Sequence, residues 1–170
     1  MKPYYVIKNG KWTKITPKVT IRNTTNIPDD VIRAVVRFVR PPGITGFKVT
    51  VCNSQYDYCG WGHSSGVKLR IGTHVRYPRK LRVYQLGQLK GRWTEPNPLT
   101  GRIHQLKGRR YYLGSLVEAL IFLAAHELMH VRQGQKGGMR SRVWGARGRY
   151  SEIETDSWAI KKLREYRRSV

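Results

Sequence analysis

Alternation of apolar and polar residues predicts several short strands in the first half of the chain. The stretch from Tyr4 to Ile15 places Asn9-Gly10 between two runs of β-prone residues, which is typical of a hairpin closed by a type I′ turn. Four further runs fit half-buried strands: residues 47–52, 67–71, 81–86 and 102–106. The segment between the first two of these runs is rich in glycine and aromatic residues, and we expect it to be a loop.

Two segments near the ends of the chain have the periodicity and end signals of helices. Pro28 and the two acidic residues after it open the apolar run 31–39, and Pro41-Pro42 should stop it. A C-terminal helix should span 151–168, with Ser151 as its N-cap. Acidic residues stand in its first turns and basic residues toward its end, a distribution that complements the helix dipole.

A capping box at Ser115 and Glu118 predicts a third helix. In such a box the serine hydroxyl accepts a hydrogen bond from the amide of Glu118, and the glutamate carboxylate reaches back to the serine amide. We expect this helix to end near Gln133, because Gly134 is a typical C-cap residue.

These elements fit one domain over residues 1–170. We predict an α+β fold in which a small twisted sheet packs on the helices of residues 113–170, with residues 1–23 as a basic N-terminal hairpin or arm. No apolar run approaches about 18 residues, and the N-terminus lacks a secretory signal. We therefore expect an intracellular, cytoplasmic protein with no membrane partner.

The helix that begins at Ser115 carries His126-Glu127-Leu128-Met129-His130. Residues four apart share a helical face, so both imidazoles can point at one cation while Glu127 stands beside a metal-bound water. Bound zinc lowers the pKa of water to about 7, and a carboxylate can take the proton and deliver it to a leaving amine. We therefore predict a zinc metalloendopeptidase that uses Zn²⁺ to hydrolyse peptide or protein substrates.

Two acidic residues of the C-terminal helix are candidates for completing this site. Glu152 and Asp156 stand four apart and share a face. If that helix packs on the first, Glu152 can become the third zinc ligand and Asp156 can accept the ring N–H of a ligand histidine, which fixes its tautomer. Glu154 competes for the ligand role; we prefer Glu152 because only that choice leaves Asp156 correctly spaced.

The His-Glu-x-x-His helix followed by a Glu-x-x-x-Asp helix resembles the gluzincins, the thermolysin-like clan of zinc metallopeptidases, over residues 113–164. Within the clan the chain is most similar to the minimal single-domain bacterial and phage enzymes. The resemblance implies a zincin-like fold, bound zinc and peptide hydrolysis. It also implies an extended substrate along a sheet edge above the active-site helix, and the strand 67–71 is the candidate for that edge.

The chain departs from the larger gluzincins in its histidines. Those enzymes carry an additional histidine downstream of the motif that stabilises the oxyanion, whereas all other histidines of this chain precede the motif. The transition-state stabiliser is therefore open between three candidates: Tyr150, Tyr112 and His104.

Charge adds a second hypothesis. Lys and Arg number 33 against 10 Asp and Glu, a formal net charge of +23. Such an excess favours polyanions, and nucleic acid above all, because each phosphate neutralised releases condensed counterion. The alternative function is therefore a basic nucleic-acid-binding protein with a structural or vestigial metal site. The two functions can also combine, as a peptidase that acts near nucleic acid.

Overall fold

The computed structural model describes residues 4–8, 11–15, 18–55, 58–63, 65–72, 75–83, 109–136 and 152–170. For some of these it describes the backbone alone: residues 4–8, 11–15, 58, 59, 61, 63, 79–83, 109–111, 152 and 153. The expected strand 102–106, the expected cap Ser151 and the candidates Tyr150 and His104 lie outside the described residues, as does the side chain of Glu152.

The described residues form three helices and three small sheets. The helices are α1 (Asp29–Val39), α2 (Leu116–Gln135) and α3 (Glu152–Arg167). The strands are β1 (Tyr4–Lys8), β2 (Lys11–Ile15), β3 (Thr20–Asn23), β4 (Lys48–Ser54), β5 (Tyr58–His63), β6 (Gly66–Gly72), β7 (Arg79–Val83) and β8 (Arg109–Leu113). Within this part of the chain, no helix combines the length and apolar character that a bilayer crossing requires.

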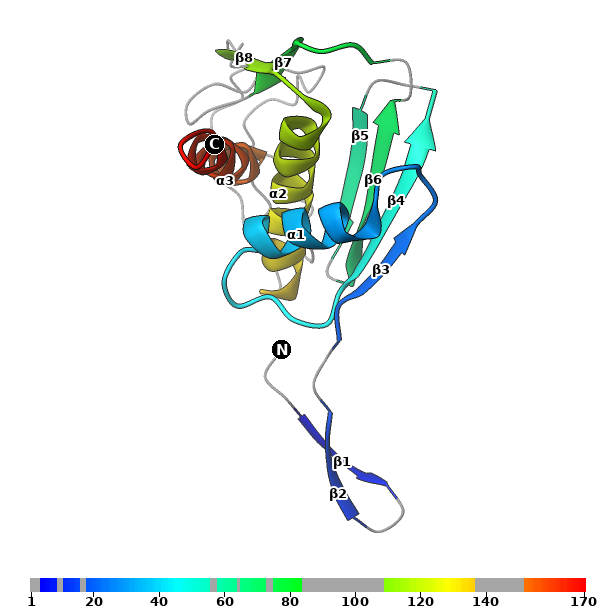
Figure 1. Ribbon diagram of the computed structural model, residues 1–170. Coiled ribbons are helices and arrows are strands. Elements are labelled where there is room, and N and C mark those ends of the chain that lie inside the picture. Colours follow the sequence, from blue (N-terminus) through cyan, green and yellow to red (C-terminus); the bar gives the residue numbers. More distant parts are fainter. Residues whose placement is uncertain are drawn as a thin grey trace, which may run out of the picture.

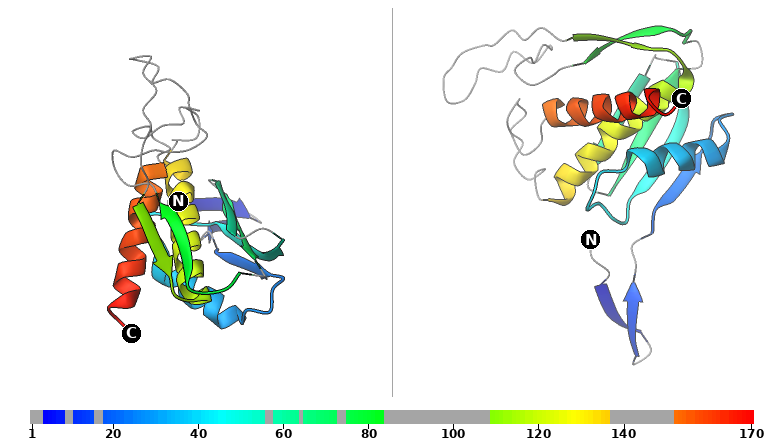
Figure 2. Two further views of the ribbon diagram at one scale, coloured as in Figure 1. Left: turned by 90° about the horizontal axis from the view of Figure 1, so that it is seen from above. Right: turned by 60° about the vertical axis from the view of Figure 1, so that its left-hand side comes forward.

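The main sheet has four strands in the order β3-β4-β6-β5. The pairs β3–β4 and β4–β6 are parallel, whereas β5 runs antiparallel to β6 and takes the edge position. All three helices lie on one side of this sheet (Figure 1), and Figure 2 shows the same arrangement from two other directions. The predicted fold class is therefore confirmed: a mixed α and β fold in which a small sheet packs on the helix of the motif.

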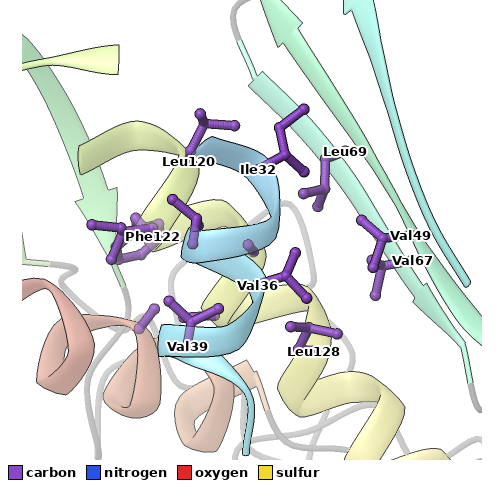
Figure 3. Packing of buried hydrophobic residues seen from close by; sticks show 14 of the residues in the cluster. Ile32, Val36, Val39, Val49, Val67, Leu69, Leu120, Phe122 and Leu128 are labelled. Carbon is purple, nitrogen blue, oxygen red and sulfur yellow. The ribbon is translucent and has the colours of Figure 1, made fainter. Parts of the chain in front are cut away.

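Helix α2 forms the centre of the hydrophobic core, because it packs against the sheet, α1 and α3 together. Figure 3 shows residues of three elements meeting in this core: Ile32 and Val36 from α1, Leu128 from α2, and Val67 and Leu69 from β6. Each of these side chains is at least 95% buried. Burial of this apolar surface is the main driving force that holds the helices on the sheet.

Helix α3 is also fixed to α1 by polar and cation–π contacts. The indole Nε1 of Trp158 donates a hydrogen bond of 2.8 Å to the carbonyl of Val39 at the end of α1. The Lys162 ammonium lies 5.0 Å from the Trp158 ring centroid and 5.1 Å from that of Phe38. These contacts fix the position of α3 relative to α1.

Several predictions from the sequence are confirmed. The two strands of the N-terminal hairpin are present, with Lys8 paired to Lys11, whereas the expected type I′ turn at Asn9-Gly10 lies outside the described residues. The helix after Pro28 and the strands expected at 47–52 and 67–71 are present as α1, β4 and β6. The N-cap hydroxyl of Ser115 accepts from the amide of Glu118 at 3.2 Å.

Two expectations about the sheet are wrong. The glycine-rich segment between β4 and β6 is not a loop, because residues 58–63 form the edge strand β5. The strand 67–71 is not at the edge, because β6 is hydrogen-bonded to β4 on one side and β5 on the other. A peptide therefore cannot extend the sheet at β6.

Two expectations about α2 also need correction. The helix does not end before Gly134 but continues through it to Gln135, whose side-chain amide exchanges hydrogen bonds of 2.8 and 3.2 Å with the backbone of Thr45. This anchor offsets the roughly 1 kcal/mol that a helical glycine costs. The carboxylate of Glu118 accepts from the amide of Gly114 at 2.6 Å, not from that of Ser115.

The other interaction of Glu118 generates a prediction about pH. Arg167 of α3 donates two hydrogen bonds to its carboxylate, at 2.8 and 2.6 Å. These bonds, together with the amide of Gly114 and the charge of Arg167, hold the pKa of Glu118 below its ordinary value against a smaller opposing effect of burial. A lowered folded-state pKa stabilises the fold above the unfolded-state value, and this contribution is lost as the pH falls through the folded-state pKa.

We expect Glu118→Gln to lower the free energy of unfolding by about 0.5–1 kcal/mol near neutral pH, as measured by urea denaturation. The difference from wild type should shrink toward zero at a pH well below the ordinary pKa of 4.5. High salt at neutral pH should also reduce it. An unchanged difference at low pH would show that the carboxylate acts through packing and not through its charge.

Candidate metal centre

The two histidines of the motif converge at the middle of α2. His126 and His130 are one helical turn apart, and their Nε2 atoms lie 3.2 Å from each other. The ring planes are nearly perpendicular, with centroids 4.9 Å apart. His130 is buried, whereas His126 keeps a small part of its side chain exposed.

The other nitrogen of each ring faces an oxygen acceptor. His126 Nδ1 lies 2.9 Å from Oδ1 of Asp156 on α3, as the sequence predicted for Asp156. His130 Nδ1 lies 3.0 Å from Oε1 of Gln133. The orientation of this amide follows from its other end, where Nε2 donates to a carboxylate oxygen of Glu154 at 2.9 Å. A carboxylate accepts only, so Oε1 must face His130.

These contacts set the tautomer of both rings. Because Asp156 and Gln133 offer oxygen acceptors, a proton on each Nδ1 satisfies both contacts and leaves the two Nε2 atoms as the positions for a cation. Two nitrogens at this separation fit either a shared proton or a metal cation bound by both. Nitrogens about 2.0–2.1 Å from a tetrahedral zinc lie about 3.3 Å apart, which matches the 3.2 Å between the two Nε2 atoms. The histidine pair therefore fits a zinc ion.

Helix α3 supplies the residues around the pair. Glu152 is the first residue of α3, one turn before Asp156, and its backbone lies on the same face of the helix. Its role as third ligand stays a prediction because its side chain is outside the described part. Among the described side chains, no group of three His, Cys, Asp or Glu surrounds a common point.

Glu154, the competing candidate for the ligand role, forms hydrogen bonds with side chains other than the two histidines. Its carboxylate accepts from Gln133 at 2.9 Å and from Arg132 at 3.3 Å, and 47% of its side chain is exposed. Glu154 is therefore connected to His130 through Gln133, by two successive hydrogen bonds. Thr155, between Glu154 and Asp156, is fully buried with its hydroxyl 3.5 Å from Nε2 of His126.

Glu127, the predicted general base, lies between α2 and the edge strand β5 and is 5% exposed. Two glycines of β5 border it. A Cβ atom at Gly60 would lie 2.1 Å from Oε1 of Glu127, and one at Gly62 would lie 2.4 Å from the Glu127 carbonyl oxygen. The backbone of β5 is therefore in direct contact with the motif.

The described part of the chain does not bring Tyr112 to the histidines. Tyr112 precedes α2, and its carbonyl accepts a hydrogen bond from Arg167 at the last turn of α3. His126 is ten residues beyond the first residue of α2, a distance of about 15 Å along the helix axis. Tyr112 is also 52% exposed, so it is not positioned as a transition-state stabiliser.

Sequence reasoning missed Gln133, Thr155 and the two glycines of β5. A signal for Gln133 was present, because it follows His130 by three residues and so lies on the same helical face. The glycines gave no such signal, because their role depends on where β5 lies in space. No protein-family model matches the chain, and neither the curated proteins nor the solved structures include a significant match to it.

The hydrogen bonds to the two Nδ1 atoms generate a prediction about metal affinity. Asp156→Asn and Gln133→Leu should each weaken zinc binding about 10–100-fold, because the first replaces a charged acceptor of a ring N–H by a neutral one and the second removes the acceptor. Competition with a zinc-sensitive chelating dye measures this change. Gln135→Leu is the matched control: it makes the same substitution on the same helix, at a side chain that bonds the backbone of Thr45. Equal zinc affinity in the two glutamine variants would contradict the assigned role of Gln133.

Proposed function

We propose that the chain is a zinc-dependent endopeptidase whose metal is held by His126 and His130, with Glu152 as the third ligand. The observation that carries this proposal is the convergence of two Nε2 atoms while both Nδ1 atoms face oxygen acceptors. This arrangement would give one cation two nitrogen ligands whose rings are held by hydrogen bonds at Nδ1. The remaining features support the same function, one by one.

The position of Glu127 suits a general base. It follows a ligand histidine directly on α2, and its carboxylate lies against β5 and away from bulk water. When bound, zinc supplies Lewis-acid chemistry that lowers the pKa of water to about 7 and polarises a carbonyl oxygen. Glu127 then takes the proton of the attacking water and delivers it to the amine that leaves.

Asp156 and Gln133 contribute by holding the two rings. A charged acceptor at Nδ1 makes His126 a stronger electron donor at Nε2, and Gln133 does the same more weakly for His130. The edge position beside the motif belongs to β5. We therefore assign to β5, in place of residues 67–71, the contact with an extended peptide substrate.

The proposal predicts a separation of metal binding from catalysis. Purified protein should contain close to one zinc per chain by elemental analysis, and His126→Ala should lose most of it. Glu127→Gln should keep the metal and lower the rate of peptide cleavage by about 10²–10⁴-fold, because it removes proton transfer alone. Casein and a quenched fluorescent peptide library serve as substrates.

Two results would count against this function. Cleavage by Glu127→Gln at the wild-type rate would remove Glu127 as the base. Wild-type protein that contains no zinc after refolding in excess zinc would contradict the proposed metal site. The variants Glu152→Ala and Glu154→Ala identify the third ligand, since only the loss of a ligand should strip the metal.

A second candidate function, nucleic-acid binding, is favoured by the face of the sheet that carries no helix. Its exposed cations come from three adjacent strands: Arg22, Lys48, Lys68 and Arg70. Arg22 pairs with Thr50 and Thr50 with Lys68, so a basic row crosses the strands. The acidic residues with described side chains belong to α1, α2 and α3, on the other side of the sheet. Such a surface suits the phosphates of a flexible single strand.

Salt dependence tests this second candidate. Lys68→Gln with Arg70→Gln should reduce the slope of log K against log salt concentration by about 1.4 for a fluorescent single-stranded oligonucleotide, because each phosphate that is no longer neutralised accounts for about 0.7. The control, Arg33→Gln with Arg37→Gln, removes the same charge from the exposed side of α1. Equal slopes for the two double variants would show attraction by net charge alone and would exclude the sheet face as a site.

A further inference from the structure

The edge strand β5 has an unusual composition where it meets the motif. Gly60 and Gly62 alternate along the strand, so both project toward the same face of the sheet. That face is the one covered by α2. Glycine is unfavourable inside strands, because it loses more conformational freedom than other residues and has no side chain to pack. We therefore expect another group to approach the strand closely at these two positions.

The space above each glycine is already taken by Glu127. A Cβ at Gly60 would stand 2.1 Å from Oε1, 2.4 Å from Cδ and 2.5 Å from Cγ of the glutamate. A Cβ at Gly62 would stand 3.1 Å from Oε2, and only 2.4 Å from the Glu127 carbonyl oxygen. Any other residue at either position would collide with the general base or with the helix that carries it.

We propose that Gly60 and Gly62 are positioning residues that form a seat for the Glu127 carboxylate on the backbone of β5. The missing side chains let the strand and the carboxylate touch, and the contact restricts the carboxylate to one side of the helix beside the histidine pair. This inference rests on the proposed function, because the seat matters only if Glu127 transfers a proton.

The two glycines differ in what a substitution would displace. At Gly60 the conflict is with the end of a side chain, so alanine there should push the Glu127 carboxylate aside and leave the helix in place. At Gly62 the conflict is with the backbone of α2, and a Cβ would also lie 2.7 Å from Cβ of His130. Alanine at Gly62 should therefore displace the helix itself and disturb folding and metal binding together. A substitution at Gly60 therefore tests the contact with the Glu127 carboxylate without moving the helix.

The first experiment compares Gly60→Ala with wild type and with Gly114→Ala. Gly114 is a matched control, because a Cβ there would also face a glutamate carboxylate, that of Glu118, but at an ordinary 3.6 Å. We expect Gly60→Ala to retain its zinc and its KM and to lose about 100-fold in kcat, as for a base displaced by about 1 Å. Gly114→Ala should match wild type. A kcat for Gly60→Ala within twofold of the control would overturn the proposal.

The second experiment needs no enzymatic activity. The urea midpoint of unfolding is measured for Gly60→Ala alone and in the Glu127→Ala background, where the carboxylate is absent. We expect the alanine at position 60 to lower the midpoint in the first case and to leave it unchanged or raised in the second. Equal lowering in both backgrounds would show that Gly60 serves strand packing alone, and the seat would be rejected.

The two experiments separate the failure of the seat from the failure of the enzyme. In one outcome, wild-type protein cleaves no peptide while the effect of Gly60→Ala on the urea midpoint depends on Glu127. That result would support the contact between Gly60 and Glu127 and contradict the peptidase function. If wild-type protein cleaves peptides and Gly60→Ala cleaves them at the same kcat, the function stands and the seat falls.

Discussion

The burial of α2 between the main sheet and α3 is the constraint on which the rest of the structure depends. This helix is apolar on nearly every side, so it cannot remain at a surface and needs cover from two directions. The sheet covers one side and brings β5 to Glu127. Helix α3 covers the other and brings Asp156 to His126. Hydrophobic packing thus assembles the polar groups that the candidate metal centre needs.

The polar groups are arranged as two short chains of hydrogen bonds that end at the histidine pair. One consists of Asp156 and His126, and the other runs from Glu154 through Gln133 to His130. Both chains begin on α3, although the histidines stand on α2. Burial makes the bonds to the two histidines worth more than they would be in water, and it makes a missing partner there correspondingly costly. The relative position of the two helices is therefore specified by polar as well as apolar contacts.

The parts of the fold that sequence reasoning found are those with local causes. A capping serine, an Asn-Gly turn, an apolar period and a His-Glu-x-x-His spacing act within a few residues, so Ser115, the hairpin and the motif could be identified directly. The contact of Asp156 with a histidine of the motif was also predictable, because Asp156 lies on the same face of α3 as Glu152. Strand β5 was missed because Gly60 and Gly62 lower strand propensity, and their cause is a glutamate more than sixty residues later in the chain. The end of α2 was missed for the same kind of reason, since Thr45 anchors Gln135 from another element.

The order of the two site helices along the chain has a consequence for biosynthesis. A ribosome releases α2 before α3, so a growing polypeptide displays both histidines while Asp156 and Glu154 are still inside the exit tunnel or untranslated. Until α3 docks, the hydrogen bonds from α3 that help to turn the two Nε2 atoms toward each other are absent, so the proposed zinc site is incomplete. Under the proposed function, translation thereby delays a competent centre until α3 is in place, and nascent chains that lack α3 should bind zinc only weakly.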